Sequence, residues 1–195
     1  MNKARLEAFS DAVIAIIITI MVLEMKVPHG DNFDALAELL PVFISYVLSF
    51  MYIATYWTNH HHLLQASDVV TGKILWANMH LLFWISLIPF TTAWMGENYS
   101  SPVPVAVYGV VLCMAALAYY LLSSTLISRH GKNSIIVGSI GSNLKGKISV
   151  FIYFIAIFLA FYMTFLSILL YVLVLVYWSV PERGIEKDIS TKLSN

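Results

Sequence analysis

The chain contains several runs of about twenty apolar residues that carry almost no charge. Four of them cover residues 9–27, 36–57, 74–94 and 103–127, and a longer run covers residues 148–180. A helix needs about 20 consecutive apolar residues to cross the hydrocarbon core of a bilayer, which is about 30 Å thick. The hydrocarbon core offers the backbone no water to bond to, so only helices and closed barrels can span it. The runs therefore predict an all-α membrane protein.

The composition supports a lipid environment. Of the 195 residues, 59% are hydrophobic and only 11% are charged, whereas soluble domains carry about 25% charged residues. The formal net charge is zero, which leaves no basic surface for nucleic acid. The single cysteine, Cys113, can form neither an internal disulfide nor a zinc cage. The lipid bilayer is thus the expected partner, and nucleic acid is not.

The last apolar run decides the number of spans. As one helix, its 33 residues would be about 50 Å long, far more than the bilayer core requires. Two helices over residues 148–164 and 166–180, turning near residues 164–167, fit the core better and give six spans. One long tilted helix remains the alternative and would give five. In either case residues 1–195 form a single transmembrane domain.

The basic residues predict the orientation. With the N-terminus inside and six spans, ten of the eleven Lys and Arg residues face the cytoplasm, and only Lys26 lies outside. An excess of Lys and Arg in cytoplasmic loops is the usual bias of membrane proteins. Both termini are therefore expected in the cytoplasm. The ten residues are Lys3, Arg5, Lys73, Arg129, Lys132, Lys145, Lys147, Arg183, Lys187 and Lys192.

Charged residues open the first predicted helix. Arg5 and Asp11 are six residues apart, so they lie on different sides of one helix and each needs its own partner. Charged groups at a membrane helix end are costly unless they are paired or hydrated. Two interpretations stay open. Either both residues anchor the helix at the interface, or both belong to a polar network with other helices.

One face of the same helix carries a pattern that could line a pore. Ala12, Ile16, Thr19 and Leu23 are spaced four, three and four residues apart, which places them on one face. Around a common axis, Ile16 and Leu23 would form apolar rings that gate ions by excluding water, and Thr19 would form a ring of hydroxyls. The spacing alone is more typical of a seam between packed helices, with Thr19 bonded to its own backbone.

Three consecutive histidines end the second span. His60, His61 and His62 follow Trp57 and Asn59, and a histidine run suggests a metal site. Successive helical residues diverge by about 100°, however, so three adjacent rings do not close easily on one ion. We therefore expect interfacial polar residues and no metal. Asn78 lies inside the third span and needs a partner within the protein.

These residues together resemble a known family. The opening pattern Arg5-x-x-x-Phe9-Ser10-Asp11 resembles the signature of the transmembrane protein 175 family of potassium channels. The resemblance covers about the first half of the chain. It continues at Trp57-x-Asn59-His60-His61, at Asn78 and at Pro89-Phe90-x-Thr92.

The resemblance implies a fold and a set of roles. It implies six helices per repeat, with the first helix of each subunit lining a potassium pore. The animal members carry two repeats, whereas this chain resembles the single-repeat tetramers of prokaryotic plasma membranes. By position, Ile16 matches the constriction, and Ala12, Thr19 and Leu23 match further pore-lining positions. The remaining matched residues are implied to form a structural polar network around the first helix: Arg5, Phe9, Ser10, Asp11, Trp57, Asn59, His60, His61 and Asn78.

The expected function is therefore a potassium-selective, leak-like channel formed by a homotetramer, not an enzyme, and without a cofactor. A secondary cation transporter is one alternative, although such proteins usually show internal repeats and broken helices around a midplane site. A membrane-embedded enzyme that binds a metal through its histidines is another, and bound stoichiometric zinc would favour it.

Overall fold

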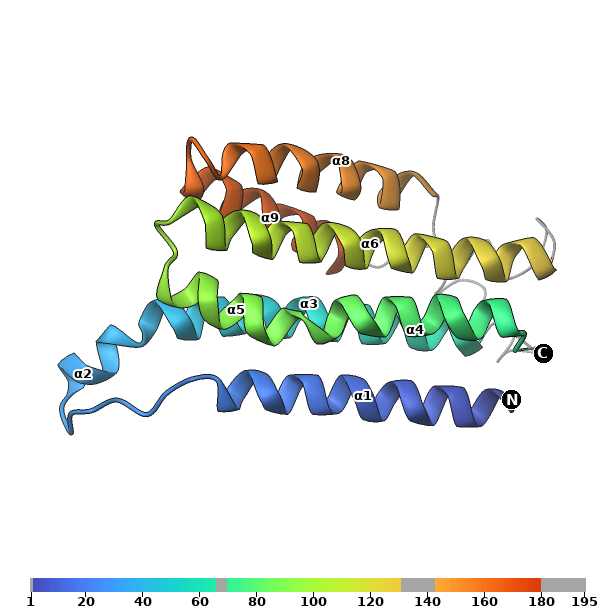
Figure 1. The fold of residues 1–195 in the computed structure, drawn as a ribbon, viewed down its shortest axis with the longest axis horizontal. Helices are drawn as coiled ribbons and strands as arrows, with labels where there is room; N and C mark the ends of the chain where they lie inside the picture. The colour runs from blue at the N-terminus through green and yellow to red at the C-terminus, as the bar shows by residue number, and fades with distance from the viewer. Residues whose placement is uncertain (1, 66–69, 131–142, 180–195) are drawn as a thin grey trace, which may run out of the picture.

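A computed structural model describes residues 2–65, 70–130 and 143–179, without the side chains of residues 129, 130, 143 and 144. Apart from the short α2, which lies at one end, the helices lie side by side along one common direction, with α1 at one edge and α8 at the opposite edge (Figure 1). They are α1 (Lys3–Leu23), α2 (Phe33–Glu38), α3 (Leu40–Gln65), α4 (Gly72–Ser86), α5 (Ile88–Glu97), α6 (Pro102–His130), α8 (Asn143–Leu159) and α9 (Thr164–Ser179).

Four segments are long and apolar enough to cross a membrane. They are α1, α3, the consecutive pair α4 and α5 over Gly72–Glu97, and Pro102–Ser128 of α6. Helix α9 is apolar but has only 16 residues, and α8 has 17. The chain is thus an all-helical membrane protein with four candidate spans in the part that the structure describes.

The helices extend beyond the predicted spans at their polar ends. Helix α1 begins at Lys3 because the side chain of Asn2 accepts a hydrogen bond from the backbone N–H of Ala4 at 3.2 Å. Helix α3 continues past the predicted end at residue 57 as far as Gln65, so the histidine run is helical. Apolar runs mark the depth of the membrane, whereas a helix continues as long as its backbone bonds are satisfied.

The long apolar run is interrupted, but earlier than residues 164–167. Helix α8 ends at Leu159 and α9 begins at Thr164. The N–H of Met163 donates to the carbonyl of Leu159 at 2.7 Å, which closes a tight turn. The hydroxyl of Ser167 then donates to the carbonyl of Ala156 at 2.7 Å and ties α9 back to α8. Ser167 is therefore a contact between the two helices and not part of the turn.

Pro89 marks the break between α4 and α5. Proline has no N–H, so one carbonyl of the preceding turn loses its helical partner, and α4 ends at Ser86. The threonines that follow bond to neighbouring carbonyls: Thr92 donates to Ile88 at 2.7 Å. Thr91 lies 3.2 Å from the carbonyls of both Leu87 and Ile88. These bonds satisfy the buried threonine hydroxyls themselves, which have no water to bond to at this depth.

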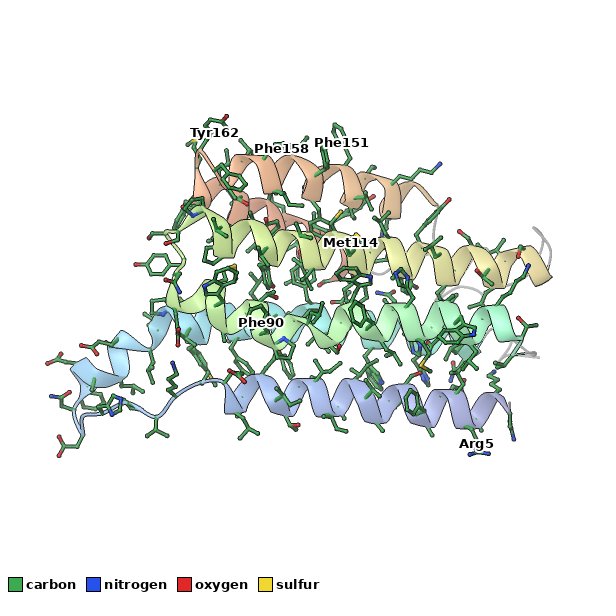
Figure 2. The ribbon with its side chains drawn as sticks, in the orientation of Figure 1. Arg5, Phe90, Met114, Phe151, Phe158 and Tyr162 are labelled. Carbon is green, nitrogen blue, oxygen red and sulfur yellow. The ribbon has the colours of Figure 1, made fainter. Side chains whose placement is uncertain are left out.

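Aromatic side chains form the middle of the bundle. Tyr108, Tyr153 and Tyr171 are fully buried, and the Tyr171 hydroxyl donates to the carbonyl of Val105 at 3.1 Å. Helix α6 can approach α9 this closely because position 109 is glycine, where a Cβ would collide with the Tyr171 hydroxyl. On the outer side of α8, by contrast, Phe151, Phe158 and the neighbouring Tyr162 point away from the bundle (Figure 2), as expected for a lipid-facing surface.

One ion pair joins the ends of α1 and α5. The Lys26 ammonium lies 2.8 Å from the Glu97 carboxylate, and both side chains are exposed. This hydrogen bond and the negative charge raise the pKa of Lys26 above its ordinary value. Lys26 lies beyond the membrane-spanning part of α1, so the pair tethers the loop after α1 at the end of the bundle that carries α2.

The raised pKa of Lys26 predicts the pH dependence of this tether. Its contribution to stability is present below the ordinary lysine pKa of about 10.4 and is lost as the pH rises through the raised value. Lys26→Gln should therefore lower the thermal unfolding midpoint slightly at pH 8, and the difference from wild type should disappear in strongly alkaline buffer. Lys73→Gln is the matched control, because Lys73 is an exposed lysine without a bonded partner among the described residues. A difference that persists unchanged at high pH would contradict this account.

Candidate functional site

Helix α1 has one packed face and one free face. Its packed side contacts α3, α4 and α5 through Leu6, Ser10, Ile14, Ile17 and Met21. The opposite side carries Ala12, Ile16, Thr19 and Leu23, all exposed in the single chain. The sequence-predicted face is thus turned away from the rest of the subunit. It is not a packing seam between α1 and another described helix of the same chain.

The free face of α1 exposes large apolar side chains. Ile16 is 57% exposed and Leu23 is 80% exposed, so this face must meet lipid, another subunit or a pore. The Thr19 hydroxyl donates to the carbonyl of Ile16 at 2.8 Å, as the backbone-bonded interpretation predicted. A hydroxyl has one proton and two lone pairs. Because the proton is used within the helix, the lone pairs of Thr19 remain available as acceptors.

A buried polar chain holds the packed face of α1. The Asn78 amide nitrogen donates to the Ser10 hydroxyl at 2.9 Å, and the Asn78 amide oxygen lies 2.7 Å from Nε2 of His60. Ser10, His60 and Asn78 are each at most 1% exposed. They come from α1, α3 and α4, so one asparagine ties three helices together.

The donor and the acceptor of each hydrogen bond in this buried polar group follow from its last acceptor, the backbone carbonyl of Leu6. The Ser10 hydroxyl lies 2.8 Å from the carbonyl of Leu6, which can only accept. Ser10 therefore donates its proton there and accepts from the Asn78 amide nitrogen, so the Asn78 amide oxygen faces His60. His60 must then donate from Nε2. Its other ring nitrogen, Nδ1, is buried and has no hydrogen-bond partner among the described residues.

A second contact joins α1 to α3 nearer the surface. The indole N–H of Trp57 donates to the Asp11 carboxylate at 2.9 Å. Arg5, in contrast, is exposed and points away from the other helices (Figure 2). Within the described part of this chain it forms no hydrogen bond or ion pair. The structure therefore separates Arg5 and Asp11, which the family resemblance placed in one network.

The remaining residues of the predicted network lie around these contacts. The His61 ring stacks on the Trp57 ring with centroids 6.0 Å apart. The Asn59 amide nitrogen donates to the carbonyl of Thr55 in its own helix at 2.8 Å. Phe9 is 48% exposed. Of the nine residues, Ser10, His60 and Asn78 form one bonded group and Asp11 and Trp57 form another.

The separation of Arg5 and Asp11 predicts different mutational effects. Asp11→Ala should lower the free energy of unfolding of the subunit by about 1–2 kcal/mol, because it leaves the Trp57 N–H without its charged acceptor. Arg5→Ala should change it by less than about 0.5 kcal/mol. Chemical unfolding in detergent, at concentrations where the subunit is monomeric, measures both.

A double-mutant cycle provides the control for the Asp11 effect. Trp57→Phe removes the donor, so combining it with Asp11→Ala should cost little more than either change alone. Additive losses, or equal destabilisation by Arg5→Ala and Asp11→Ala, would show that the two contacts described here do not govern the stability of this helix end.

The histidines do not assemble a metal site in the described ranges. Within residues 2–65, 70–130 and 143–179, no three His, Cys, Asp or Glu side chains are grouped so that they could hold an ion. The His60 and Asn78 side chains bond to each other, and His80 accepts from the indole of Trp84 at 3.0 Å. No described geometry therefore favours metal chemistry.

The sequence did not indicate a second buried polar group between α3, α5 and α6. The Thr92 hydroxyl lies 2.7 Å from the Ser49 hydroxyl and accepts from it, because its own proton is donated to the carbonyl of Ile88. Ser49 in turn lies 2.9 Å from the Tyr108 hydroxyl. Isolated Ser, Thr and Tyr residues are common in membrane helices because they can bond to their own backbone. The only signal was that Ser49 and Thr92 lie in predicted spans and need internal partners.

Comparison with known proteins gives consistent matches. The family model described as "Endosomal/lysosomal potassium channel TMEM175" matches residues 5–89. A potassium channel of Chryseobacterium sp. (strain P1-3) is 48% identical over 189 residues, which cover 97% of this chain and 98% of that protein. The endosomal/lysosomal proton channel TMEM175 of Gallus gallus is 27% identical over 65% of this chain, but over only 28% of its own length.

A solved structure has the same fold. It is the crystal structure of a lysosomal potassium-selective channel TMEM175 homologue from Chamaesiphon minutus. It superimposes with a TM-score of 0.79 at 26% sequence identity and covers 91% of this chain and 96% of its own. The family model covers the residues of the α1 contacts, and the Chryseobacterium relative matches nearly the whole chain. This chain therefore belongs to the TMEM175 family.

Proposed function

We propose that this protein is a potassium-selective, leak-like channel in which four copies of the chain surround one pore. Membership of the family supports potassium as the permeant ion, and the relative that matches nearly the whole chain is named a potassium channel. One helix of one subunit cannot enclose a pore, and closed symmetry is the usual way to complete one.

The observation that carries the proposal is the free face of α1. Its other face is fixed to α3 and α4 by the buried chain through Asn78, so the orientation of Ile16, Thr19 and Leu23 is set by the subunit. Four such faces around an axis would give an apolar ring at Ile16, acceptor oxygens at Thr19 and a second apolar ring at Leu23, with the small Ala12 below. Apolar rings control hydration, and oxygen rings replace part of the water lost by the ion.

We also propose that each subunit has six spans, with α8 and α9 as the fifth and sixth, in one domain of residues 1–195. Their lengths correspond to about 24–26 Å at 1.5 Å per residue, close to the thickness of the bilayer core. Lys3, Lys73 and Lys145 lie at the starts of α1, α4 and α8. This common basic end supports a cytoplasmic N-terminus, and the bacterial relative that matches nearly the whole chain supports a prokaryotic plasma membrane. Lys132, Arg183, Lys187 and Lys192 lie outside the described residues.

Recording from purified protein in planar bilayers tests the proposed function. With potassium on one side and sodium on the other, the current should reverse at a potential far from zero, negative on the potassium side, and should not require a second substrate. A reversal potential near zero would show that the protein does not select potassium over sodium. Flux that needs a counter-ion would support the transporter alternative, and a reversal that follows the pH gradient would favour protons.

Cysteine labelling tests the orientation and the number of spans. Single cysteines at Asn32 and Asn98 should react with an impermeant maleimide added to intact cells. Cysteines at the exposed Lys73 and Lys147 should react only after permeabilisation. Prior removal of Cys113 by Cys113→Ala provides the background control. Labelling of Lys147 and Lys73 positions from opposite sides would contradict the proposed arrangement.

A further inference from the structure

A cavity lies between α3, α6, α8 and α9. Its empty space is about 610 Å³ when the open mouth is included. The walls are mainly aromatic, and Gly146 in the first turn of α8 forms part of them. The lining includes Tyr52, Tyr56, Tyr119, Tyr153, Trp178 and Gly146.

This cavity is separate from the contacts that hold α1. On α3, Tyr56 and Asn59 line the cavity, whereas Trp57 and His60 bond toward α1 and α4. Residues three apart share a helix face, and residues one apart do not. The cavity thus lies on a different side of α3 from the α1 network.

The hydroxyl groups of the wall differ in their bonding. Tyr153 donates to Tyr52 at 3.2 Å, and Tyr119 lies 3.4 Å from the carbonyl of Asn59. The hydroxyls of Tyr56 and Tyr120 have no hydrogen bond to any described residue. Tyr56 is partly buried beside the Tyr119 ring, with centroids 6.2 Å apart, so its hydroxyl is a free polar group within an aromatic wall.

The chemistry of the wall selects the kind of occupant. None of the lining residues in the described part of the chain is charged, which disfavours an ionic ligand because no described group would offset its desolvation. A water molecule in a cavity usually needs two to four polar partners. The wall has a few polar groups, but most of its accessible surface is apolar, which favours an apolar body over a cluster of waters. Aromatic walls instead favour offset or edge contacts with another ring. A molecule with one ring and one hydroxyl would satisfy both the walls and Tyr56.

We propose that this cavity binds a small neutral molecule that carries an aromatic ring and one hydroxyl group. The ring packs among the tyrosines and Trp178, and the hydroxyl pairs with Tyr56. Such a ligand bridges α3 to α6, α8 and α9 within one subunit and does not touch α1. The proposal does not depend on the ion that the protein conducts.

Fluorine NMR titration of the full chain in detergent with 4-fluorophenol tests this site. Wild type should give a saturable shift of the fluorine resonance. Gly146→Leu should abolish it, because a Cβ at position 146 meets only the Tyr120 ring at 3.9 Å and a larger side chain can enter the cavity. Leucine is also a better helix former than glycine, so the variant should fold.

The matched control is Gly72→Leu. A Cβ at Gly72 meets nothing within 4 Å, and Gly72 does not line the cavity, so this variant should bind the probe like wild type. Partition into the micelle is the same for both variants. Equal saturable shifts in wild type and Gly146→Leu would therefore overturn the proposal, because they would show that the probe binds outside this cavity. If Gly146→Leu does not fold, Ala116→Met fills the same cavity from α6 and decides the question.

Hydroxyl recognition is tested separately with fluorobenzene, which lacks the hydroxyl. Wild type should bind 4-fluorophenol about fivefold more tightly than fluorobenzene, the effect of one net hydrogen bond. Tyr56→Phe should remove this preference, and Tyr120→Phe should keep it. Equal affinities in wild type, or a preference that survives Tyr56→Phe, would overturn the assignment of Tyr56 as the hydroxyl partner.

Discussion

Replacing Ile16 by asparagine should raise the unitary potassium conductance by on the order of tenfold and weaken selectivity. In the proposed pore, the barrier at this ring comes from exclusion of water, and a polar side chain would wet the constriction. Lowering a barrier by about 1.4 kcal/mol raises a rate about tenfold. Single-channel recording in planar bilayers measures this effect independently of how much protein folds.

Two neighbouring substitutions act as matched controls on the same face. Thr19→Ala removes the free lone pairs but leaves both apolar rings, so it should reduce the preference for potassium over sodium with little change in conductance. Leu23→Ala should resemble Ile16→Asn with a smaller effect. Unaltered unitary conductance and reversal potential in all three variants would show that α1 does not line the pore.

The same measurements separate a pore from a contact between subunits. If Ile16 only packed against a neighbouring copy, Ile16→Asn would destabilise the assembly. The total current would then fall with the number of channels, while each remaining channel would conduct as before. Ile20, also exposed on α1 but at the edge of this face, offers a further comparison. Ile20→Asn should change conductance less than Ile16→Asn.

The sequence predicts the helices of this protein well because each span leaves an apolar run. It also predicts that Ile16, Thr19 and Leu23 share one side of α1, and the structure leaves these three residues exposed in the single chain. The partners of individual polar residues were harder to predict. The family resemblance placed His60 and Asn78 in one polar network, and these two side chains do bond to each other.

Other features could not be predicted because they depend on packing between helices that are apolar on every side. The sequence of α6 or α9 does not show that Gly109 faces the Tyr171 hydroxyl, or that Tyr52 donates to the carbonyl of Tyr171. Periodicity assigns a face only when polar and apolar residues alternate around the helix. For the same reason the tyrosine cavity has no counterpart in any sequence motif.

The position of Arg5 shows a different limit. Its spacing from Asp11 correctly indicated that the two residues do not pair along one helix. The resemblance then grouped Arg5 with the polar network, but in the single chain it points away from that network (Figure 2). A residue whose partner lies in another copy, or in water, cannot be placed from the contacts of one chain.

Replacing Asn78 by leucine should have the largest effect on folding. The side chains are similar in size, but the change removes two buried hydrogen bonds and leaves the His60 Nε2–H without an acceptor. Because Nδ1 of His60 already has no partner among the described residues, the whole ring would be buried unpaired. Each buried unsatisfied group costs about 1–3 kcal/mol, so the subunit should lose roughly 2–5 kcal/mol of unfolding free energy. Chemical unfolding in detergent, followed by tryptophan fluorescence, measures the loss.

The cause of that loss can be tested by removing the stranded partners as well. Replacing all members of a buried polar group by apolar residues can be nearly neutral, whereas removing one member is not. The triple variant Ser10→Ala, His60→Leu, Asn78→Leu should therefore be more stable than Asn78→Leu alone, although it carries more substitutions. Ser86→Ala is the matched control, because Ser86 is exposed at the end of the same helix and bonds only to the carbonyl of Phe83. Its stability should stay within about 0.5 kcal/mol of wild type. If the triple variant were less stable than the single one, the cost would come from lost packing, and the directed chain from His60 to Leu6 would not be what holds α1 to α3 and α4.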